Sequence, residues 1–314
     1  MSLNVALTGA TGFVGRKVVA ALLAKKHRVT ALVRDVEKAD LPKAVKLVAG
    51  DLGNSNDFAR EADVVIHIAG AIRALDRHGY FQVNEQGTKS IVETAIRSCV
   101  KRFVHISSLS AREPQLSAYG ASKLAGENVL DAVLKKISVV KLRPPAVYGP
   151  GDKATLPLIK ALTQSLAFLP ARADARFSLI YVDDLARIIV DAATSDRTGV
   201  IELDDGTLPG HDWKELVGIA ANLEQKKIKA IYLPKLLLMV VAPFVEVIAK
   251  LRGKPAMISR EKVNELYHSD WVAEGPRWPL KNATDFARGF ADTVAWYRRE
   301  NWLPHSDSSP KITT

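Results

Sequence analysis

Two side chains four residues apart, Tyr119 and Lys123, could together carry out proton transfer. In a helix, residues i and i+4 lie on one face, so the phenol and the ammonium would be neighbours. A phenol titrates at about pH 10, but a neighbouring positive charge stabilises the phenolate and lowers its pKa. The pair is therefore suited to exchanging a proton with a substrate oxygen. The same spacing also occurs on ordinary solvated helix faces, so the interpretation needs support from elsewhere in the chain.

Two consecutive serines, Ser107 and Ser108, supply part of that support, because Tyr119 follows Ser108 by eleven residues. They stand at the end of an apolar run that we predict to be a strand. A serine hydroxyl at this place can hold the substrate oxygen by a hydrogen bond while the proton moves. We assign this role to Ser108 and keep Ser107 as the alternative.

Three glycines near the start of the chain, Gly9, Gly12 and Gly15, have the spacing of a dinucleotide-binding turn. The first permits a tight turn, the second lets the backbone approach a pyrophosphate, and the third lets a helix pack on a strand. The N–H groups and the positive end of that helix attract phosphate charge. The other residues of the predicted cofactor-binding turn are Thr11, Phe13 and Val14.

Arg34 stands at the end of the second predicted strand, where NAD-selective sites place an acid for the ribose 2′-hydroxyl. A guanidinium suits the 2′-phosphate of NADP instead. We therefore expect NADP as the cofactor. Asp35 follows directly, so NAD remains the alternative.

Short apolar strands alternate with helical patterns through the first half of the chain, which predicts βαβ units and a doubly wound parallel sheet, a Rossmann fold. We expect a dinucleotide-binding domain over 1–150, to which 178–205 return, with a strand over 180–182. A smaller, mostly helical substrate lobe is expected over 151–177 and 206–303, followed by a flexible tail over 304–314. The predicted strands are 3–7, 28–33, 45–48, 64–68, 102–106, 139–142 and 200–203. The predicted helices include 13–26, 80–98, 119–136 and 156–166.

Several motifs together make the chain resemble an extended short-chain dehydrogenase/reductase of the NAD-dependent epimerase/dehydratase superfamily, and the resemblance covers almost the whole chain. They are the glycine turn, Gly50-Asp51-Leu52, His67-Ile68-Ala69-Gly70, Val83 to Thr88, Ser107-Ser108, Tyr119 to Lys123, Leu142-Arg143-Pro144 with Val147 to Gly151, and Tyr181 to Asp184.

The resemblance implies a role for each matching residue. Tyr119 would be the acid/base, Ser108 the catalytic hydroxyl, and Lys123 would bind the nicotinamide ribose and tune Tyr119. The remaining cofactor contacts would come from strand ends. Asp51 and Leu52 would edge the adenine, Ala69 and Gly70 would line the ribose and pyrophosphate, and the segment after Arg143, with Pro144 and Val147, would wall the nicotinamide.

At several positions the chain differs from particular branches of the family, and these differences limit the reactions that we expect it to catalyse. Leu109 and Ser110 stand where sugar dehydratases carry an acidic pair, so dehydration is disfavoured. Ala146 replaces an asparagine found in many nucleotide-sugar epimerases. The second lobe resembles that of 3β-hydroxysteroid dehydrogenases and dihydroflavonol reductases. We therefore expect hydride transfer at an alcohol or ketone carbon of a small, rather apolar molecule, with a nucleotide-sugar 4-epimerase as the alternative.

A third interpretation is a protein that binds NADPH without turnover, as in a respiratory complex I subunit and certain redox-sensing regulators. The segment 105–111 is similar to the complex I group. The intact pair of Tyr119 and Lys123 argues against this interpretation, because a pure binder need not keep both.

The composition of the chain limits the kinds of partner that we expect it to bind. The net charge is +10, but the basic residues are spread along the chain, and we expect no nucleic acid. A single cysteine, Cys99, suits a reducing cytoplasm. The histidines do not cluster at metal-ligand spacing, so we expect no metal.

The ten uncharged residues 236–245 are too few to span a membrane. They are expected to form a buried helix or the wall of an apolar pocket, with a helix lying on a membrane as the alternative. Two long helices on one face of the sheet make a homodimer a further expectation.

Three other residues have predicted structural roles. His67 is expected to pack in the core. Asn84 would either cap the helix that begins nearby or hold a water near Lys123. Glu127 would form a simple helix salt bridge with Lys123, four residues earlier.

Overall fold

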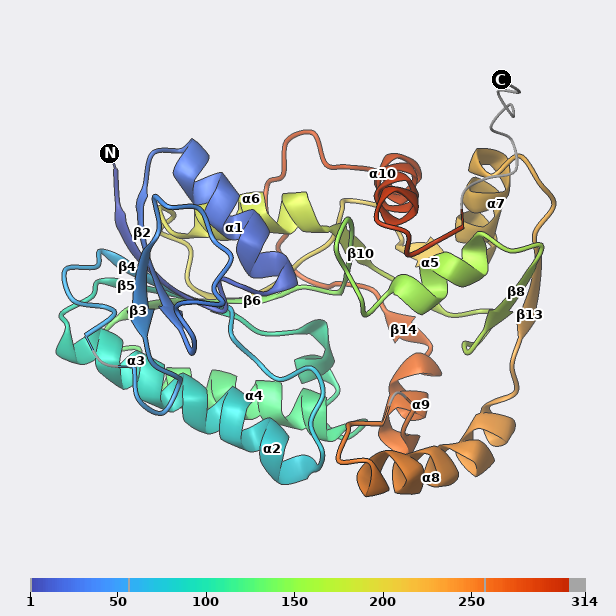
Figure 1. Ribbon diagram of the computed structural model, residues 1–314, viewed down its shortest axis with the longest axis horizontal. Helices are drawn as coiled ribbons and strands as arrows, with labels where there is room; N and C mark the ends of the chain where they lie inside the picture. The colour runs from blue at the N-terminus through green and yellow to red at the C-terminus, as the bar shows by residue number, and fades with distance from the viewer. Residues whose placement is uncertain (1, 56, 257, 305–314) are drawn as a thin grey trace.

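The computed structural model describes residues 2–55, 57–256 and 258–304, and a seven-stranded parallel sheet occupies the left half of the view in Figure 1. Its strand order is β11-β6-β5-β4-β1-β2-β3. The order reverses between β1 and β4, so the loops that follow these two strands diverge and leave a crevice at their carboxyl ends. The strands are β1 (Asn4–Thr8), β2 (Arg28–Val33), β3 (Lys46–Ala49), β4 (Val64–His67), β5 (Arg102–Ile106), β6 (Ser138–Arg143) and β11 (Gly199–Glu202).

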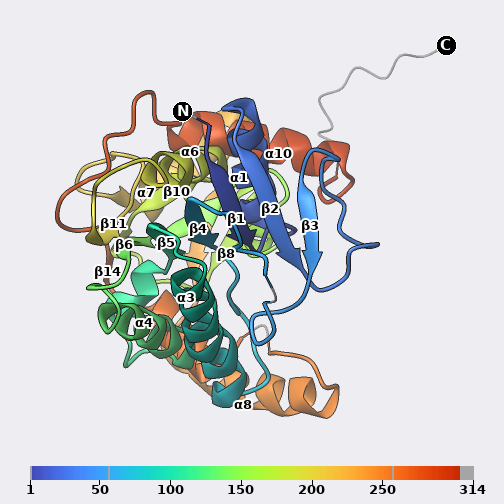
Figure 2. The same ribbon diagram turned by 90° about the vertical axis from the view of Figure 1, so that its left-hand side faces the viewer.

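Helices cover both faces of this sheet, which confirms the predicted doubly wound fold (Figures 1 and 2). Helices α1 (Phe13–Ala24) and α6 (Val182–Ala192) pack together over one face, and α3 (Gly87–Arg97) and α4 (Ala118–Asp131) over the other. All residues of β4 and β5 are buried, because each strand has apolar neighbours on two sides.

The helix predicted over 80–98 is interrupted. It begins earlier, as α2 (Arg77–Phe81), where the side chain of Asp76 accepts a 2.8 Å hydrogen bond from Gly79 N. A π-helical turn, η1 (Gln82–Gln86), then separates α2 from α3. Periodicity cannot show such a turn, since it adds one residue without changing composition. Helix α4 also ends earlier than predicted, at Asp131.

The strand expected over 180–182 does not return to the main sheet. Residues Leu179–Tyr181 form β10, which pairs with β7 (Ala146–Tyr148) in a separate two-stranded sheet, and Val182 begins α6. Strand β11, by contrast, does join the main sheet beside β6.

The remaining elements are short strands and helices. They are α5 (Leu156–Leu162), β8 (Leu166–Leu169), β9 (Arg176–Phe177), β12 (His211–Asp212), α7 (Trp213–Leu223), β13 (Lys229–Tyr232), α8 (Lys235–Leu251), α9 (Arg260–Leu266), β14 (Asp270–Trp271) and α10 (Phe286–Arg299). The predicted apolar helix is α8, and none of the helices in the described ranges is long and apolar enough to cross a membrane. Of the expected flexible tail, residues 305–314 lie outside the described residues.

Candidate active site

The glycine turn joins the ends of β1 and β4. Gly9 has a φ of +76°, and a Cβ there would come within 2.7 Å of Ala69 N. A Cβ on Gly15 would overlap the carbonyl oxygen of Gly9. Glycine adopts the positive φ at no steric cost, and the absence of a Cβ at both positions permits the close approach of helix and turn. The turn and the Ala69-Gly70 segment therefore lie against one another, as a shared cofactor-binding surface requires.

The first turn of α1 is open to an anion. Gly12 is the N-cap of the helix and provides no side-chain cap, and the first turn contains no acidic residue. Thr11 is exposed, while Phe13 and Val14 are half-buried. Because the N-terminal N–H groups of a helix carry partial positive charge, the turn fits the pyrophosphate of a dinucleotide.

The ends of β2 and β3 provide the next surface along this edge. Arg34 directly follows β2 and is exposed. The side chain of Asp35 is engaged within its own turn, where it accepts a 2.7 Å hydrogen bond from Lys38 Nζ and is held at a lowered pKa by that bond. Arg16 of α1 lies beside the glycine turn, since its Nε donates to Thr11 O at 3.2 Å. Sequence reasoning missed Arg16, although its place in the first turns of α1 could have drawn attention to it.

Asp51 and Leu52 occupy the end of β3. The carboxylate of Asp51 accepts hydrogen bonds of 2.8 Å from Gly53 N and Asn54 N, which orders the turn. Leu52 is partly buried against the core between the sheet and α3. Both residues are therefore fixed at the carboxyl edge where the adenine contact was predicted.

Ser108 and Tyr119 lie near each other, close enough for the serine hydroxyl to act on the pKa of the phenol. Helix α4 begins one residue before Tyr119, and its N-cap, Ser117, accepts a 3.0 Å hydrogen bond from Gly120 N. Burial raises the pKa of Tyr119 to about 12, and the hydroxyl of Ser108 opposes this rise. The lowered tyrosine pKa that we expected is therefore not found in the protein alone, because the cost of burying a phenolate is the larger effect.

Lys123 is buried one helical turn after Tyr119 and beside the Ala69-Gly70 segment. Its Nζ donates a 2.7 Å hydrogen bond to Ile106 O, and a Cβ on Gly70 would lie 3.6 Å from it. Burial lowers the pKa of Lys123 to about 8, against the opposing influence of Glu127. The ammonium thus lies where the ends of β4 and β5 and the face of α4 meet.

Ser107 points away from this centre. Its hydroxyl donates to Glu127, whose carboxylate also accepts from Arg143 Nε at 2.9 Å and Nη2 at 2.8 Å. The buried Glu127 pairs with Arg143 rather than with Lys123, so the expected simple helix salt bridge is wrong. The geometry separates the roles of the two serines, because Ser107 belongs to a buried ionic network and Ser108 faces Tyr119.

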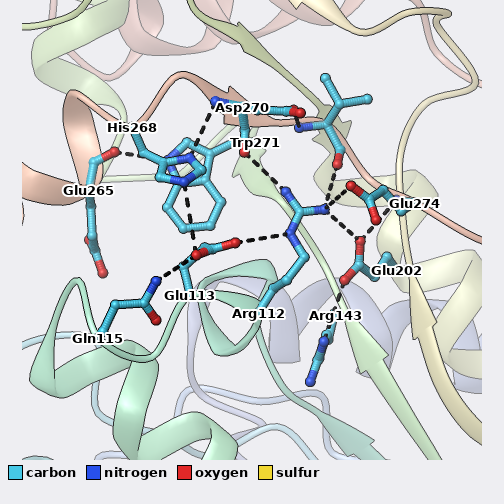
Figure 3. Close-up of polar contacts among 11 residues, drawn as sticks. Arg112, Glu113, Gln115, Arg143, Glu202, Glu265, His268, Asp270, Trp271 and Glu274 are labelled. Carbon is cyan, nitrogen blue, oxygen red and sulfur yellow. Dashed lines mark hydrogen bonds and ion pairs between the residues drawn. The ribbon is translucent and has the colours of Figure 1, made fainter.

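This ionic network continues toward the second half of the chain (Figure 3). Arg143 and Arg112 both pair with Glu202, at 3.4 and 3.1 Å, and Arg112 also donates to Val272 O at 2.7 Å and to Asp270 O at 3.0 Å. The strand ends of the sheet are therefore tied to the segment that follows α9.

Asn84 lies in the π-helical turn and does not cap a helix. Its amide exchanges hydrogen bonds with Ala71, from Ala71 N at 2.8 Å and to Ala71 O at 3.0 Å, and also donates to Ser122 Oγ at 2.9 Å. It thus clamps the segment after β4 onto α4, one residue before Lys123.

His67 packs in the core as expected, between Thr8 Oγ1 at 2.7 Å and Thr88 Oγ1 at 3.2 Å. Its ring stacks on His105, with ring centroids 5.5 Å apart. Burial lowers the pKa of His67 to about 3, so both rings are neutral supports of the site.

Pro144 and Val147 follow β6. Pro144 O accepts a 2.9 Å hydrogen bond from Leu109 N, which brings this segment beside Ser108, and Val147 lies in β7. The predicted residues thus gather along the carboxyl edge of the sheet, with Arg34 and Asp51 at one end and Ser108, Tyr119 and Pro144 at the other.

A Rossmann sheet with a glycine turn at its switch point and a serine, tyrosine and lysine at the adjoining strand end defines a dinucleotide-dependent oxidoreductase. The family model described as the NAD dependent epimerase/dehydratase family matches residues 5–203. The chain belongs to this family and is an NAD(P)-dependent enzyme, which confirms the resemblance found in the sequence.

Relatives and solved structures agree with this membership. A "Ceramide reductase" of Caulobacter vibrioides is 37% identical over 311 residues, which cover 96% of either chain. A "UDP-glucose 4-epimerase" of Vibrio cholerae is 32% identical over 220 residues, 60% of this chain and 66% of that protein. The structure of a UDP-N-acetylglucosamine 4-epimerase from Methanobrevibacter ruminantium has a TM-score of 0.73 at 18% identity and covers 95% of this chain and 99% of that chain.

Proposed function

We propose that the protein is an NADP-dependent reductase that transfers hydride to a ketone carbon of an apolar, lipid-like molecule, or removes it from the corresponding alcohol. The observation that carries this proposal is the grouping of Ser108 and Tyr119 with the buried ammonium of Lys123, which donates to Ile106 O at the strand end that leads to Ser108. The substrate class rests on similarity to the ceramide reductase, which extends over 96% of the chain.

Each of the three residues has a definite task. With a pKa of about 12, Tyr119 is protonated at neutral pH and donates its proton to the carbonyl oxygen in the reducing direction. Ser108 holds that oxygen by a hydrogen bond. Lys123, with a pKa of about 8, is mostly charged at neutral pH and stabilises the phenolate left on Tyr119. A bound nicotinamide cofactor supplies the hydride.

The predicted strand-end residues would hold the cofactor. We assign the phosphates to the glycine turn, the 2′-phosphate to Arg34, and NADP as the preferred cofactor, with NAD as the alternative. The engagement of Asp35 by Lys38 supports Arg34 as the group that meets the ribose. The other cofactor contacts would be Asp51, Leu52, Ala69, Gly70, Lys123, Pro144 and Val147.

We further propose the domain division stated above, a location in the cytoplasm and a homodimer. The packing of Trp278 qualifies the division, because this residue of the expected substrate lobe belongs to the apolar core shared by the sheet, α1 and α6.

A nucleotide-sugar 4-epimerase is the second candidate, favoured by the identity with the Vibrio cholerae enzyme. An assay with NADPH distinguishes the candidates. We expect oxidation of NADPH on adding a ceramide-type ketone dispersed in detergent, and no interconversion of UDP-hexoses by mass spectrometry. Epimerised UDP-sugar without net consumption of NADPH would establish the second candidate. Tight NADPH binding with no turnover on either panel would identify a non-catalytic binder.

A further inference from the structure

Helix α8 presents an apolar face to solvent. Eight of its large apolar side chains are exposed, including Phe244 at 68% and Leu251 at 83%. They recur at intervals of three and four residues, so they form one continuous stripe along the helix. We call this stripe the α8 face. Its residues are Leu236, Leu237, Val240, Val241, Phe244, Val247, Ile248 and Leu251.

The opposite side of α8 is its attachment to the protein. Leu238 and Ala242 are buried there against Val263 of α9 and Tyr267. Because α8 packs on the protein through this buried side, the α8 face lies outside the core. Figure 2 shows α8 projecting beyond the rest of the chain.

Basic residues lie at both ends of the α8 face. Lys235 begins the helix, and Lys250, Arg252 and Lys254 follow one another at its far end, all exposed. The acidic residue of the helix, Glu246, accepts a 2.7 Å hydrogen bond from Arg260 N and so caps the chain toward α9. An exposed apolar stripe with cationic ends is the pattern of a helix that lies in the interface of an anionic bilayer.

We propose that the α8 face docks the protein on the surface of a membrane that contains anionic lipids. The basic residues at the ends of α8 favour an anionic membrane over a second copy of the chain. Two α8 faces packed together would also bring their basic ends together, and like charges repel. This inference goes beyond the proposed reaction and does not depend on it.

The docking helix is linked directly to the catalytic helix. On α9, which carries α8, Glu265 accepts a hydrogen bond from Ser117 and Glu261 accepts one of 2.8 Å from Ala118 N. These are the two residues before Tyr119. A membrane bound to the α8 face would therefore lie on the side of the molecule from which α9 reaches the start of α4.

Flotation of the full chain with vesicles tests the proposal without substrate or cofactor. We expect binding to vesicles of phosphatidylcholine with phosphatidylglycerol and little binding to phosphatidylcholine alone. The double variant L237E/F244E should bind about tenfold more weakly or less, and R252Q/K254Q should weaken binding to the anionic vesicles. The matched control is L134E, an exposed leucine beyond the end of α4. It should bind like the unchanged protein.

Circular dichroism and NADPH binding would verify that each variant is folded. Equal vesicle binding by L237E/F244E and L134E would overturn the proposal. So would a stable dimer in solution that L237E/F244E dissociates while the unchanged protein ignores vesicles, because a second copy would then be the occupant of the face. Absence of ketone reduction with normal vesicle binding would instead contradict the proposed function alone.

Discussion

The ammonium of Lys123 donates a 2.7 Å hydrogen bond to the carbonyl oxygen of Ile106, the last residue of β5. The bond fixes one face of α4 to the strand end that leads into the two serines. The bond therefore helps to place the face of α4 that carries Tyr119 beside the segment that carries Ser108. The same ammonium is buried, so the arrangement has a cost in folding free energy.

The variant Y119F should lose turnover by about 10²- to 10⁴-fold, because it removes the proton that the ketone oxygen receives. NADPH affinity should change little. The matched control is Y80F, since the ring of Tyr80 lies 6.2 Å from that of Tyr119. Steady-state kinetics with calorimetric NADPH binding checks this. Turnover retained by Y119F would remove the tyrosine from the mechanism.

The variant K123M should stabilise the free protein at pH 7 while abolishing turnover. The pKa of Lys123 is lowered from 10.5 to about 8, so folding opposes its charge. The penalty is fully present below pH 8 and is relieved as the pH rises toward 10.5. At roughly 1.4 kcal/mol per pKa unit, it amounts to about 3 kcal/mol.

Urea unfolding at pH 7 and pH 9.5 measures this effect, and the gain from K123M should shrink at the higher pH. The control is K141M, which removes a buried lysine paired with Asp131 at 2.6 Å and should give no gain. A K123M protein less stable than the unchanged one at pH 7 would contradict the prediction.

The variant R34A should weaken NADPH binding by roughly ten- to a hundredfold, the worth of a charge-assisted hydrogen bond to phosphate. NADH binding should be nearly unchanged. Calorimetry with both cofactors checks this, with R60A as the control, since Arg60 is an exposed residue of the segment that leads into β4. An equal loss for NADH and NADPH would show that Arg34 does not read the 2′-phosphate.

The variant R143M should destabilise the fold by about 3–5 kcal/mol, because it leaves the carboxylate of Glu127 buried with its strongest partner removed. The double variant E127Q/R143M should recover part of this loss. Chemical denaturation of the three proteins measures the coupling. Additive losses would mean that the pair is not a unit.

Acid should destabilise the protein through His67. Its folded pKa, about 3, lies below the ordinary value of 6.5. The stability that this neutral ring contributes is therefore fully present above pH 6.5 and is lost as the pH falls toward 3. The loss is about 4–5 kcal/mol over that range. H67Q should reduce the dependence of unfolding free energy on pH between 6.5 and 4, and the buried His105 should account for a remaining part, whereas H78Q, at an exposed site, should leave the dependence unchanged.

The main sheet and the order of the motifs could be predicted because buried parallel strands are short apolar runs, and glycine turns are local patterns. The strands Arg28–Val33 and Arg102–Ile106 have the predicted bounds. Periodicity missed the π-helical turn and the short strand pairs of the second half. Their formation depends on long-range pairing, such as that of β8 with β13.

The residues of the candidate site were likewise predictable only in part. Tyr119, Lys123 and Ser108 were found from spacing, but the partner of Glu127 was not, because Arg143 is distant in sequence and becomes its neighbour only when β6 pairs beside β5. The raised pKa of Tyr119 in the protein alone was not foreseen either, because the burial that causes it cannot be judged from spacing.

The turn at Gln82–Gln86 makes the spacing of this region sensitive to length. A π-helical turn holds one residue more than an α-helical one, so removal of a single residue there would restore a regular helix. The preceding helix would then rotate by about 100° relative to α3. Tyr80 would swing away from Tyr119, and the clamp between Asn84 and Ala71 would open. A one-codon deletion would therefore dismantle the cofactor crevice without altering any residue that contacts the reacting atoms.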